Sequence, residues 1–430
     1  MIIHVPELVR RPLHNWSGTY RYQARAVHYP RTTAELQSLI ARGGSLHALG
    51  TRHSFNTIGD AGELISLTEL PGEPMINAED RTVIVPARMR YGEVAVFLQE
   101  AGWALRNMAS LPHISVAGSV ATATHGSGNH NPTLASAVKA MTMVIGTGDL
   151  VQLDQKSPDF PGAVVHLGAL GVVTELTLAI EPTFNARQDI YQRLSWDVLT
   201  GSFEDVMGSG SSVSAVTDFA GDTVQLLWVK TRMVENEPRE MPSELFGATA
   251  ATEQLHMTPG NDPLHCTPQL GEPGPWHERI PHFKLGYNPS TGAEIQSEYL
   301  IERRHAPNAI NALRQLGTLI ASLAKSAEIR TIAADDLWLS PAYGRDIFGV
   351  HFTWRPDPRA VAEILIKIED ALAPYEPRPH WAKVFGDTFD FARLYPKLSD
   401  FSALVDQYDP KGTFRAPYLT RTVLGLRAAT

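Results

Sequence analysis

The chain has 430 residues, 43% of them hydrophobic, which is longer than one hydrophobic core normally supports. We therefore expect two domains. The net charge is -9, from 37 basic and 46 acidic residues, and this argues against a nucleic-acid surface. A small neutral or cationic ligand is compatible with that charge.

Cys266 is the single cysteine, so neither an intrachain disulfide nor a cysteine metal cluster can form. The Arg10-Arg11 pair lacks the apolar stretch that would have to follow it in an export signal. No run approaches the roughly 18 apolar residues of a membrane span. We expect a cytoplasmic monomer with neither membrane nor nucleic-acid partners.

The first part of the chain predicts alternating strands and helices. A helix is expected over Thr33–Arg42, with Thr32 or Thr33 as its N-cap, and another over Tyr91–Ala101, ended by Gly102. Strands are expected at Thr82–Val85, Lys139–Ile145, Leu150–Leu153 and Val172–Ile180.

A domain boundary is expected near Glu181-Pro182. Beyond it, a loop-rich, proline-containing stretch covers Asn236–Pro275, and helices are expected over Pro307–Lys325 and Asp357–Leu372. Three late segments, EIRTI, HFTW and HWAKVF, are predicted to be strands.

Two N-terminal segments are candidates for binding a ligand. In Asn107–Gly128, small residues let the backbone approach a diphosphate, and hydroxyl and N–H groups can bind it. A tight structural loop is the alternative. In Leu46–Asn56, an apolar strand runs into Gly50 and then presents His53. By spacing alone, a histidine after such a turn is more often a capping or core residue than a ligand-binding one.

Polar residues recur with a period of two in the late strands. Glu328 and Arg330 share one strand face, His351 and Thr353 share another, and Lys383 lies in the third segment. The apolar neighbours indicate that these strands are half buried, so their charges need partners. A structural Glu–Arg pair and a polar substrate pocket both remain open.

Other motifs are dismissed. Gly146-Thr147-Gly148 stands between two strands and predicts a hairpin turn, not a dinucleotide site. His277 and His282 are five residues apart, with Pro281 between them, so they predict a loop contact and no metal site. Walker and Gly-x-Ser-x-Gly sequences are absent.

The two N-terminal segments together resemble the flavin-attachment and pyrophosphate segments of the vanillyl-alcohol-oxidase-like flavoproteins. Within them, the chain is most similar to the alditol (xylitol) oxidases of the sugar-1,4-lactone oxidase group. The resemblance covers nearly the whole chain and includes NWSGTYRY, GALGVVTEL, GPWHERIPHF, EIQSEYL, EIRTIAADDLWLSPAYGRD, HFTW and HWAKVF.

The resemblance implies an α+β fold of two domains, of the vanillyl-alcohol-oxidase (PCMH) type. Residues 1–182, completed by 384–430, would form the FAD-binding domain. Residues 183–383 would form a mixed-sheet substrate domain, with the flavin at the junction.

The resemblance also implies a set of site residues. FAD would be attached covalently through His53 to its 8α-methyl group. Lys383, Arg330 and Glu328 would be catalytic and, with Ser110, His351 and Thr353, would bind substrate. The implied cofactor-binding residues are Gly50, Thr51, Arg52, His53, Ser54, Ala109, Ser110, Ser115, Gly118, Ser119, Thr122, Thr124, His125, Gly126 and Val173.

Two segments depart from the family pattern. Thr51-Arg52 stands where relatives have Ser-Gly before the histidine, and Phe414–Tyr418 replaces a segment that contains a flavin-side asparagine. The implied reaction is oxidation of the primary hydroxyl of an alditol such as xylitol or sorbitol to the aldose, with oxygen reduced to hydrogen peroxide. An aldonolactone oxidase or dehydrogenase and a non-catalytic flavin or sugar binder are the alternatives.

Overall fold

The computed structural model describes residues 7–8, 12–233, 242–286 and 293–425. The Arg10-Arg11 pair and residues 236–241 of the loop-rich stretch lie outside the described residues. Among the described residues, every helix is too short or too polar to span a bilayer.

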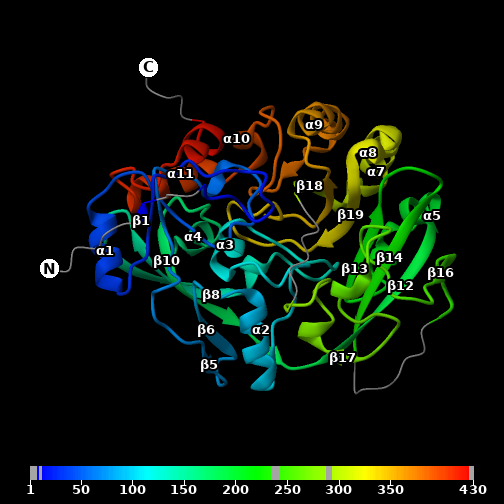
Figure 1. Cartoon of the computed structure of the whole chain (residues 1–430), viewed down its shortest axis with the longest axis horizontal. Coiled ribbons are helices and arrows are strands. Elements are labelled where there is room, and N and C mark those ends of the chain that lie inside the picture. Colours follow the sequence, from blue (N-terminus) through cyan, green and yellow to red (C-terminus); the bar gives the residue numbers. More distant parts are fainter. Residues whose placement is uncertain (1–6, 9–11, 234–241, 287–292, 426–430) are drawn as a thin grey trace.

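The N-terminal part contains a four-stranded sheet, a five-stranded sheet (Figure 1) and a short pair of β7 (Trp103–Ala104) with β11 (Glu181–Pro182). The first has the order β1-β2-β4-β3, with β1 at Glu7–Leu8, β2 at Ala26–His28, β3 at Leu46–Ala48 and β4 at Glu63–Ile65. The second has the order β5-β6-β10-β8-β9, with β5 at Met75–Asn77, β6 at Thr82–Pro86, β8 at Val138–Ile145, β9 at Leu150–Asp154 and β10 at Gly171–Ala179. The helices of this part are α1 (Thr33–Ala41), α2 (Tyr91–Glu100), α3 (Val116–Ala121) and α4 (Phe160–Val164).

Local sequence signals explain these elements. The side chain of Thr32 caps α1 by accepting a 3.1 Å hydrogen bond from the N–H of Glu35. Helix α2 ends before Gly102, whose φ of +79° suits glycine. Strands β8 and β9 form the predicted antiparallel hairpin, with Gly148 at φ +92° in its turn.

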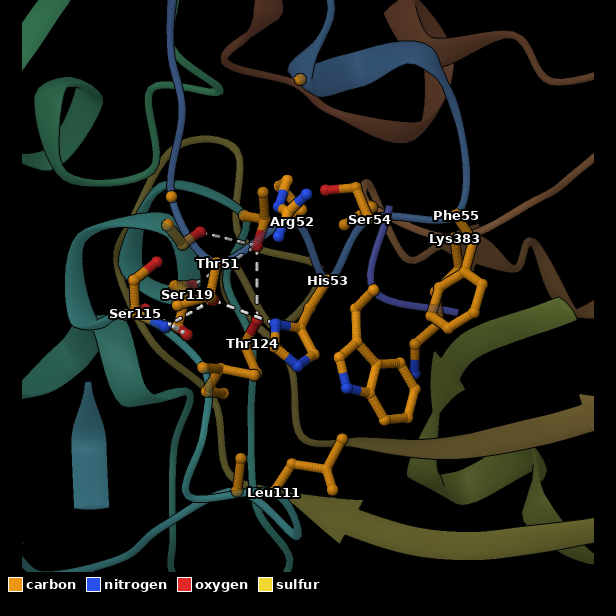
Figure 2. A pocket seen from close by; sticks show the side chains of 18 of the residues that line it. Thr51, Arg52, His53, Ser54, Phe55, Leu111, Ser115, Ser119, Thr124 and Lys383 are labelled. Carbon is orange, nitrogen blue, oxygen red and sulfur yellow. Dashed lines mark hydrogen bonds between the residues drawn. The ribbon is translucent and has the colours of Figure 1, made fainter. Parts of the chain in front are cut away.

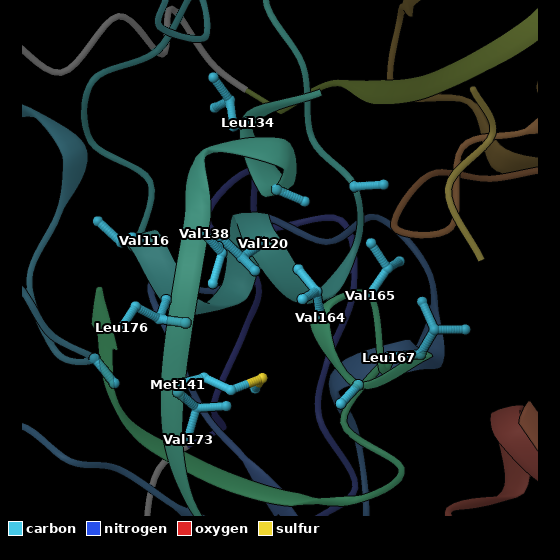
Figure 3. Packing of buried hydrophobic residues seen from close by; sticks show 14 of the residues in the cluster. Val116, Val120, Leu134, Val138, Met141, Val164, Val165, Leu167, Val173 and Leu176 are labelled. Carbon is cyan, nitrogen blue, oxygen red and sulfur yellow. The ribbon is translucent and has the colours of Figure 1, made fainter. Parts of the chain in front are cut away.

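The core of the N-terminal part lies between the five-stranded sheet and the short helices. Figure 3 shows Val116 and Val120 of α3 beside Val138 and Met141 of β8. Residues from the end of the chain, among them Phe401 of α11 (Leu398–Tyr408), belong to the same buried cluster. Both ends of the sequence therefore build one core (Figure 1).

A ten-stranded sheet dominates the middle of the chain, with the order β15-β16-β12-β14-β13-β19-β20-β18-β21 and β17 paired to β12. Its principal strands are β12 (Asn185–Ser195), β13 (Ser212–Thr217), β14 (Thr223–Arg232), β18 (Ile295–Glu302), β19 (Ala324–Ile332) and β20 (Ile347–Trp354). The short strands are β15 (Glu244–Leu245), β16 (Ala248–Ala250), β17 (Gly274–Pro275) and β21 (Arg378–Pro379).

The expected α+β architecture is confirmed, with a correction to this sheet. Its described strand pairs are all antiparallel, so it is not mixed. Parallel pairing occurs in the N-terminal sheet, where β4 pairs with β2 and β3. In the large sheet, β13 and β14 are joined by a short turn, which pairs strands antiparallel, whereas parallel neighbours need a crossover.

Helices cover one face of the large sheet (Figure 1). They are α5 (Trp196–Gly201), α6 (Phe203–Met207), α7 (Ala306–Arg314), α8 (Gly317–Leu323) and α9 (Pro358–Leu372). Ile329 and Phe352 pack with Ile310 of α7 and Ile364 of α9. Because side chains alternate along a strand, the polar neighbours of Ile329 and Phe352 point to the other face.

The predicted helix over Pro307–Lys325 is wrong in two respects. It is broken between α7 and α8, and its last two residues begin β19. Gly317, at the start of α8, passes so close to the carbonyl of Phe219 that a Cβ would lie 2.2 Å from that oxygen. The chain leaves the helical conformation at Leu316, with φ -96° and ψ 4°, before α8 begins.

The predicted strand HWAKVF is also wrong. The N–H of Lys383 donates to the carbonyl of His380 at 3.0 Å, which makes a turn directly after β21. The carbonyl of Trp381 accepts from Tyr418 Oη at 2.9 Å and from Asn56 Nδ2 at 2.8 Å. Side chains thus satisfy backbone groups that a strand would have paired with a neighbour. Tyr418 belongs to the segment that departs from the family pattern.

Candidate active site

A cavity of about 380 Å³ lies where loops of the N-terminal part face the polar side of the large sheet. It is lined by all the predicted site residues except Gly126. Gly126 is needed for packing instead, because a Cβ there would lie 2.4 Å from the carbonyl oxygen of Met108. The two predicted groups of residues, distant in sequence, therefore share one space.

His53 projects into this cavity from the loop after β3. Its Nδ1 lies 2.9 Å from the hydroxyl of Thr51, which also accepts a 3.0 Å hydrogen bond from the N–H of Ser115 (Figure 2). The imidazole stacks on Trp16 at 5.1 Å between ring centroids. Burial lowers the pKa of His53 to about 4, so the ring is neutral at pH 7. Its buried Nε2 has no hydrogen-bond partner in the described part of the chain.

Arg52 adopts a left-handed conformation with φ +63°, which accounts for the glycine that relatives have at this position. Its side chain is exposed and donates to the carbonyl of His14 at 3.1 Å. Figure 2 shows the Arg52 guanidinium and the His53 imidazole on opposite sides of the loop. The bulk of Arg52 thus leaves the cavity side of His53 open.

The small-residue segment Asn107–Gly128 forms the adjoining wall of the cavity, which we call the cofactor wall. A Cβ at Gly50 would lie 2.5 Å, and one at Gly118 2.8 Å, from the hydroxyl of Ser115. The hydroxyls of Ser119 and Thr122 donate to backbone carbonyls of the same turn, at 2.8 Å to Ser115 and 3.0 Å to Gly118. The wall is therefore narrow, polar and built mostly from backbone. Together with the unpartnered Nε2 of His53, such a wall fits a flavin dinucleotide.

The opposite wall is the polar face of the large sheet. Glu298, His351 and Glu328 stand in one row across β18, β20 and β19. In the next row, Gly349 lies opposite Arg330 and provides no side chain. A Cβ at Gly349 would lie 3.3 Å from Glu298 Oε1, so this glycine leaves room for the Arg330–Glu298 contact.

Glu298 is the centre of the charge cluster, and the sequence interpretation missed it. Its Oε1 accepts from Arg330 Nη2 at 2.6 Å and lies 3.2 Å from His125 Nε2, while its Oε2 accepts from Lys383 Nζ. Its side chain is 0% exposed. Burial alone would raise the pKa of Glu298, but Lys383, Arg330 and His125 hold it well below its usual range. A lone acidic residue inside the apolar strand IQSEYLI was the available signal.

Lys383 joins Glu298 to His351. Its Nζ donates to His351 Nδ1 at 2.8 Å, and His351 Nε2 lies 3.2 Å from the Thr353 hydroxyl. Burial lowers the pKa of Lys383, and the Glu298 carboxylate opposes that shift. Burial also places the pKa of His351 well below its usual value, so His351 is a neutral acceptor.

Glu328 is much less completely bonded. Its Oε2 lies 3.7 Å from Arg330 Nε, and its Oε1 lies 4.0 Å from His282 Nε2. Glu328 Oε1 and Arg330 Nε are buried without hydrogen-bond partners in the described part of the chain. The predicted Glu328–Arg330 pair is therefore the weaker one, because Arg330 is held mainly by Glu298.

A second layer lies behind Glu328, and it too was missed. The buried Lys230 donates from Nζ to the carbonyl of Ile280 at 2.5 Å. Burial lowers the pKa of Lys230 to about 7, against the opposing charge of Glu328. His282 packs against Trp228 at 4.9 Å between ring centroids, and its N–H donates to the carbonyl of Ser110 at 3.1 Å. His282 thus makes the expected loop contact, and the described residues contain no cluster of three or more potential metal ligands.

Two models of known protein families match the two segments of the chain that form the walls of the cavity. Residues 24–154 match the model of the FAD binding domain, and residues 293–422 match that of D-arabinono-1,4-lactone oxidase. Alditol oxidase of a Streptomyces species is 44% identical over 412 residues, which cover 94% of this chain and 97% of that protein. The chain belongs to the alditol oxidase family.

More distant relatives share the whole length. L-gulono-1,4-lactone dehydrogenase of Mycobacterium tuberculosis is 27% identical, covering 96% of this chain and 98% of that protein. L-gulonolactone oxidase of Mus musculus is 24% identical, covering 95% and 97%. The crystal structure of cholesterol oxidase from B. sterolicum has a TM-score of 0.78 at 15% identity, covering 97% of each chain. That likeness confirms the predicted two-domain flavoprotein fold.

Proposed function

We propose that the protein oxidises the primary hydroxyl of an alditol, such as xylitol or sorbitol, to the aldose with FAD as cofactor. One observation carries this proposal. A wall built mostly from backbone, suited to a dinucleotide, faces the charged side of the large sheet across a single cavity. The alditol oxidase relative at 44% identity supports the same substrate class.

When bound, FAD supplies the acceptor for a hydride from the carbinol carbon. The side chains of this protein perform the rest. Lys383 and Arg330 stabilise negative charge that develops on the substrate oxygen, an interaction worth several kcal/mol away from water. Glu328, with an unpartnered oxygen in the cavity wall, accepts hydrogen bonds from further hydroxyls. Ser110, His351 and Thr353 also line the cavity and complete the polyol site.

The proposal is tested by mixing the purified yellow protein anaerobically with xylitol, sorbitol, glycerol and galactonolactone. Bleaching of the flavin by the linear polyols supports an alditol oxidase. Bleaching by the lactone alone makes the protein a lactone oxidase or dehydrogenase, the class of two more distant relatives. A flavin that none of these compounds reduces would indicate a binding protein.

We propose that FAD is attached through His53. Its neutral ring and unpartnered Nε2 suit a bond to the flavin, and the outward direction of Arg52 leaves that bond unhindered. Flavin fluorescence should remain in the protein band on a denaturing gel and should disappear in His53→Ala. Release of free flavin from the unmodified protein would contradict the linkage.

Oxygen is the proposed electron acceptor. Ala109 lines the cavity beside Ser110, and a methyl group there narrows an approach to the flavin edge without closing it. After reduction by polyol, admission of air should restore the oxidised spectrum and release hydrogen peroxide, and Ala109→Gly should accelerate this step. Reoxidation over many minutes, with rapid transfer to a dye, would identify a dehydrogenase.

The domain boundaries at residues 182 and 383 remain part of this proposal, as do a monomeric state and a cytoplasmic location. The shared core of the two chain ends supports the first. A single, buried cysteine is compatible with a reducing compartment.

A further inference from the structure

Glu298 is the one carboxylate that contacts both walls of the cavity through described side chains. His125 belongs to the segment Asn107–Gly128 of the cofactor wall. Arg330 and Lys383 belong to the opposite wall, the substrate wall, which includes the polar face of the large sheet. We infer that Glu298 is a positioning residue. It keeps Lys383 protonated and holds the side chains of Lys383 and Arg330 toward the cofactor wall. This inference rests on the proposed function.

The first step of the argument is electrostatic. Lys383 and Arg330, with 13% and 7% of their side chains exposed, are two largely buried cations that share one carboxylate. A buried charge is stable only with a partner, and removal of that partner leaves the charge uncompensated. Without the carboxylate of Glu298, Lys383 would face Arg330 with Glu328 and Glu294 as counter-charges, neither of which forms an ion pair with it in the described part of the chain, and its cheapest response would be to lose a proton.

No other neighbour can replace Glu298. The charged and titratable groups around Lys383 come from every element packed against it: Glu294 just before β18, Glu298 on β18, Glu328 and Arg330 on β19, His351 on β20, and His125 and His380 from loops. Burial lowers the pKa of His351 and of His380 far below neutrality. Within this set of described residues, Glu298 alone forms an ion pair with Lys383.

The second step is geometric. Lys383 stands in a turn, not in a strand, so no ladder of backbone hydrogen bonds fixes its direction. Glu298 stands in the middle of β18, between β20 and β21, and is completely buried. A rigid strand therefore supplies the anchor for an ammonium group on a turn. The contact with His125 ties the same anchor to the cofactor wall.

The test compares Glu298→Gln and Glu298→Asp with Glu302→Gln as control. Glu302 lies on the same strand, but it pairs with Arg304 away from the cavity. The first readout is independent of activity: trace acetylation of the flavin-loaded protein across pH, with the Lys383 peptide quantified by mass spectrometry. Only the neutral amine reacts, so the midpoint of the labelling rate reports the pKa of Lys383.

In Glu298→Gln we expect this midpoint to fall by about one pH unit or more, the usual size for loss of a close opposite charge. The alkaline limit of flavin reduction by polyol should move down by the same amount, because the ammonium form is the active one. Glu298→Asp keeps the charge and should leave the midpoint near that of the unmodified protein. Glu302→Gln should change neither value.

An unchanged labelling midpoint and pH profile in Glu298→Gln would overturn the inference. If Glu298→Gln does not fold, Glu298→Asp decides: a lower rate of reduction at unchanged KM supports a positioning role, and an unchanged rate refutes it. Failure of every polyol to reduce the unmodified protein would refute the proposed function instead. The acetylation midpoint would still test the charge of Lys383.

Discussion

Glu298 and Glu328 stand in the same row of one sheet, on either side of His351, yet their surroundings differ. Glu298 makes close contacts with Arg330, Lys383 and His125 and is 0% exposed. Glu328 has no ion pair shorter than 3.7 Å within the described residues, and one of its oxygens is buried without a partner.

A buried polar atom without a partner costs about 1–3 kcal/mol and usually has a functional reason. At Glu328 the reason we propose is a hydroxyl group of the substrate. Glu298, by contrast, has both oxygens in close contact with described side chains and is 0% exposed. In our proposal these contacts fix the cations before substrate arrives, which is how charge stabilisation is prepared in enzymes. We therefore propose that one carboxylate organises the site and that the other is available to bind.

The largest effect is expected from Lys383→Met. If Lys383, held by Glu298, stabilises the charge that develops during the reaction, loss of its ammonium group should lower kcat and kcat/KM alike, by about 10² or more. Steady-state kinetics with xylitol or sorbitol measure this. Lys397→Met is the control, because Lys397 pairs with Asp400 at the surface. A rise in KM alone would make Lys383 a binding residue and remove the distinction between the two carboxylates.

A smaller effect is expected from Glu328→Gln. The amide keeps the shape but loses the charge, and hydrogen bonds to charged groups contribute about 1.5–3 kcal/mol. Binding of a polyol should therefore weaken by about 10- to 100-fold, measured as KM or as the dissociation constant in anaerobic titrations. An alcohol with a single hydroxyl is the control substrate and should bind nearly as before. Equal loss for both substrates would place Glu328 at the reacting hydroxyl.

The sequence predicts those parts of the fold and site that depend on local pattern. Alternation along EIRTI and HFTW places Glu328, Arg330, His351 and Thr353 on one sheet face, where the structure has them. The cap at Thr32 and the hairpin between β8 and β9 also follow from nearby residues.

What the sequence does not predict depends on contacts between distant residues. Glu298 is 32 residues from Arg330 and 85 from Lys383, so nothing near it reveals its partners. The turn at Lys383 is held by Asn56 and Tyr418, from opposite ends of the chain. A strand prediction based on HWAKVF alone cannot include them.

The smallest effect on activity, less than about 10-fold, is expected from Lys230→Met, which tests what lies behind Glu328. The pKa of Lys230 is lowered to about 7 in the fold, whereas an unfolded lysine titrates near 10.4. Below pH 7 both states hold the proton, and burial of the charge destabilises the fold in full. Between about pH 7 and 10 the folded state is neutral while the unfolded state remains protonated, so the penalty shrinks with rising pH. The Tm of the unmodified protein should therefore rise relative to that of Lys230→Met between pH 7 and 9.5.

The same Tm measurement also tests whether the charge of Glu328 acts on Lys230. The charge of Glu328 raises the pKa of Lys230, in opposition to burial. In Glu328→Gln, the lower limit of the pH range over which this Tm difference depends on pH should therefore move to lower values. A Tm difference that is independent of pH would show that Lys230 titrates normally. If the lower pH limit is the same in Glu328→Gln, the charge of Lys230 does not interact with Glu328. The unpartnered oxygen of Glu328 would then depend on the substrate alone for a partner.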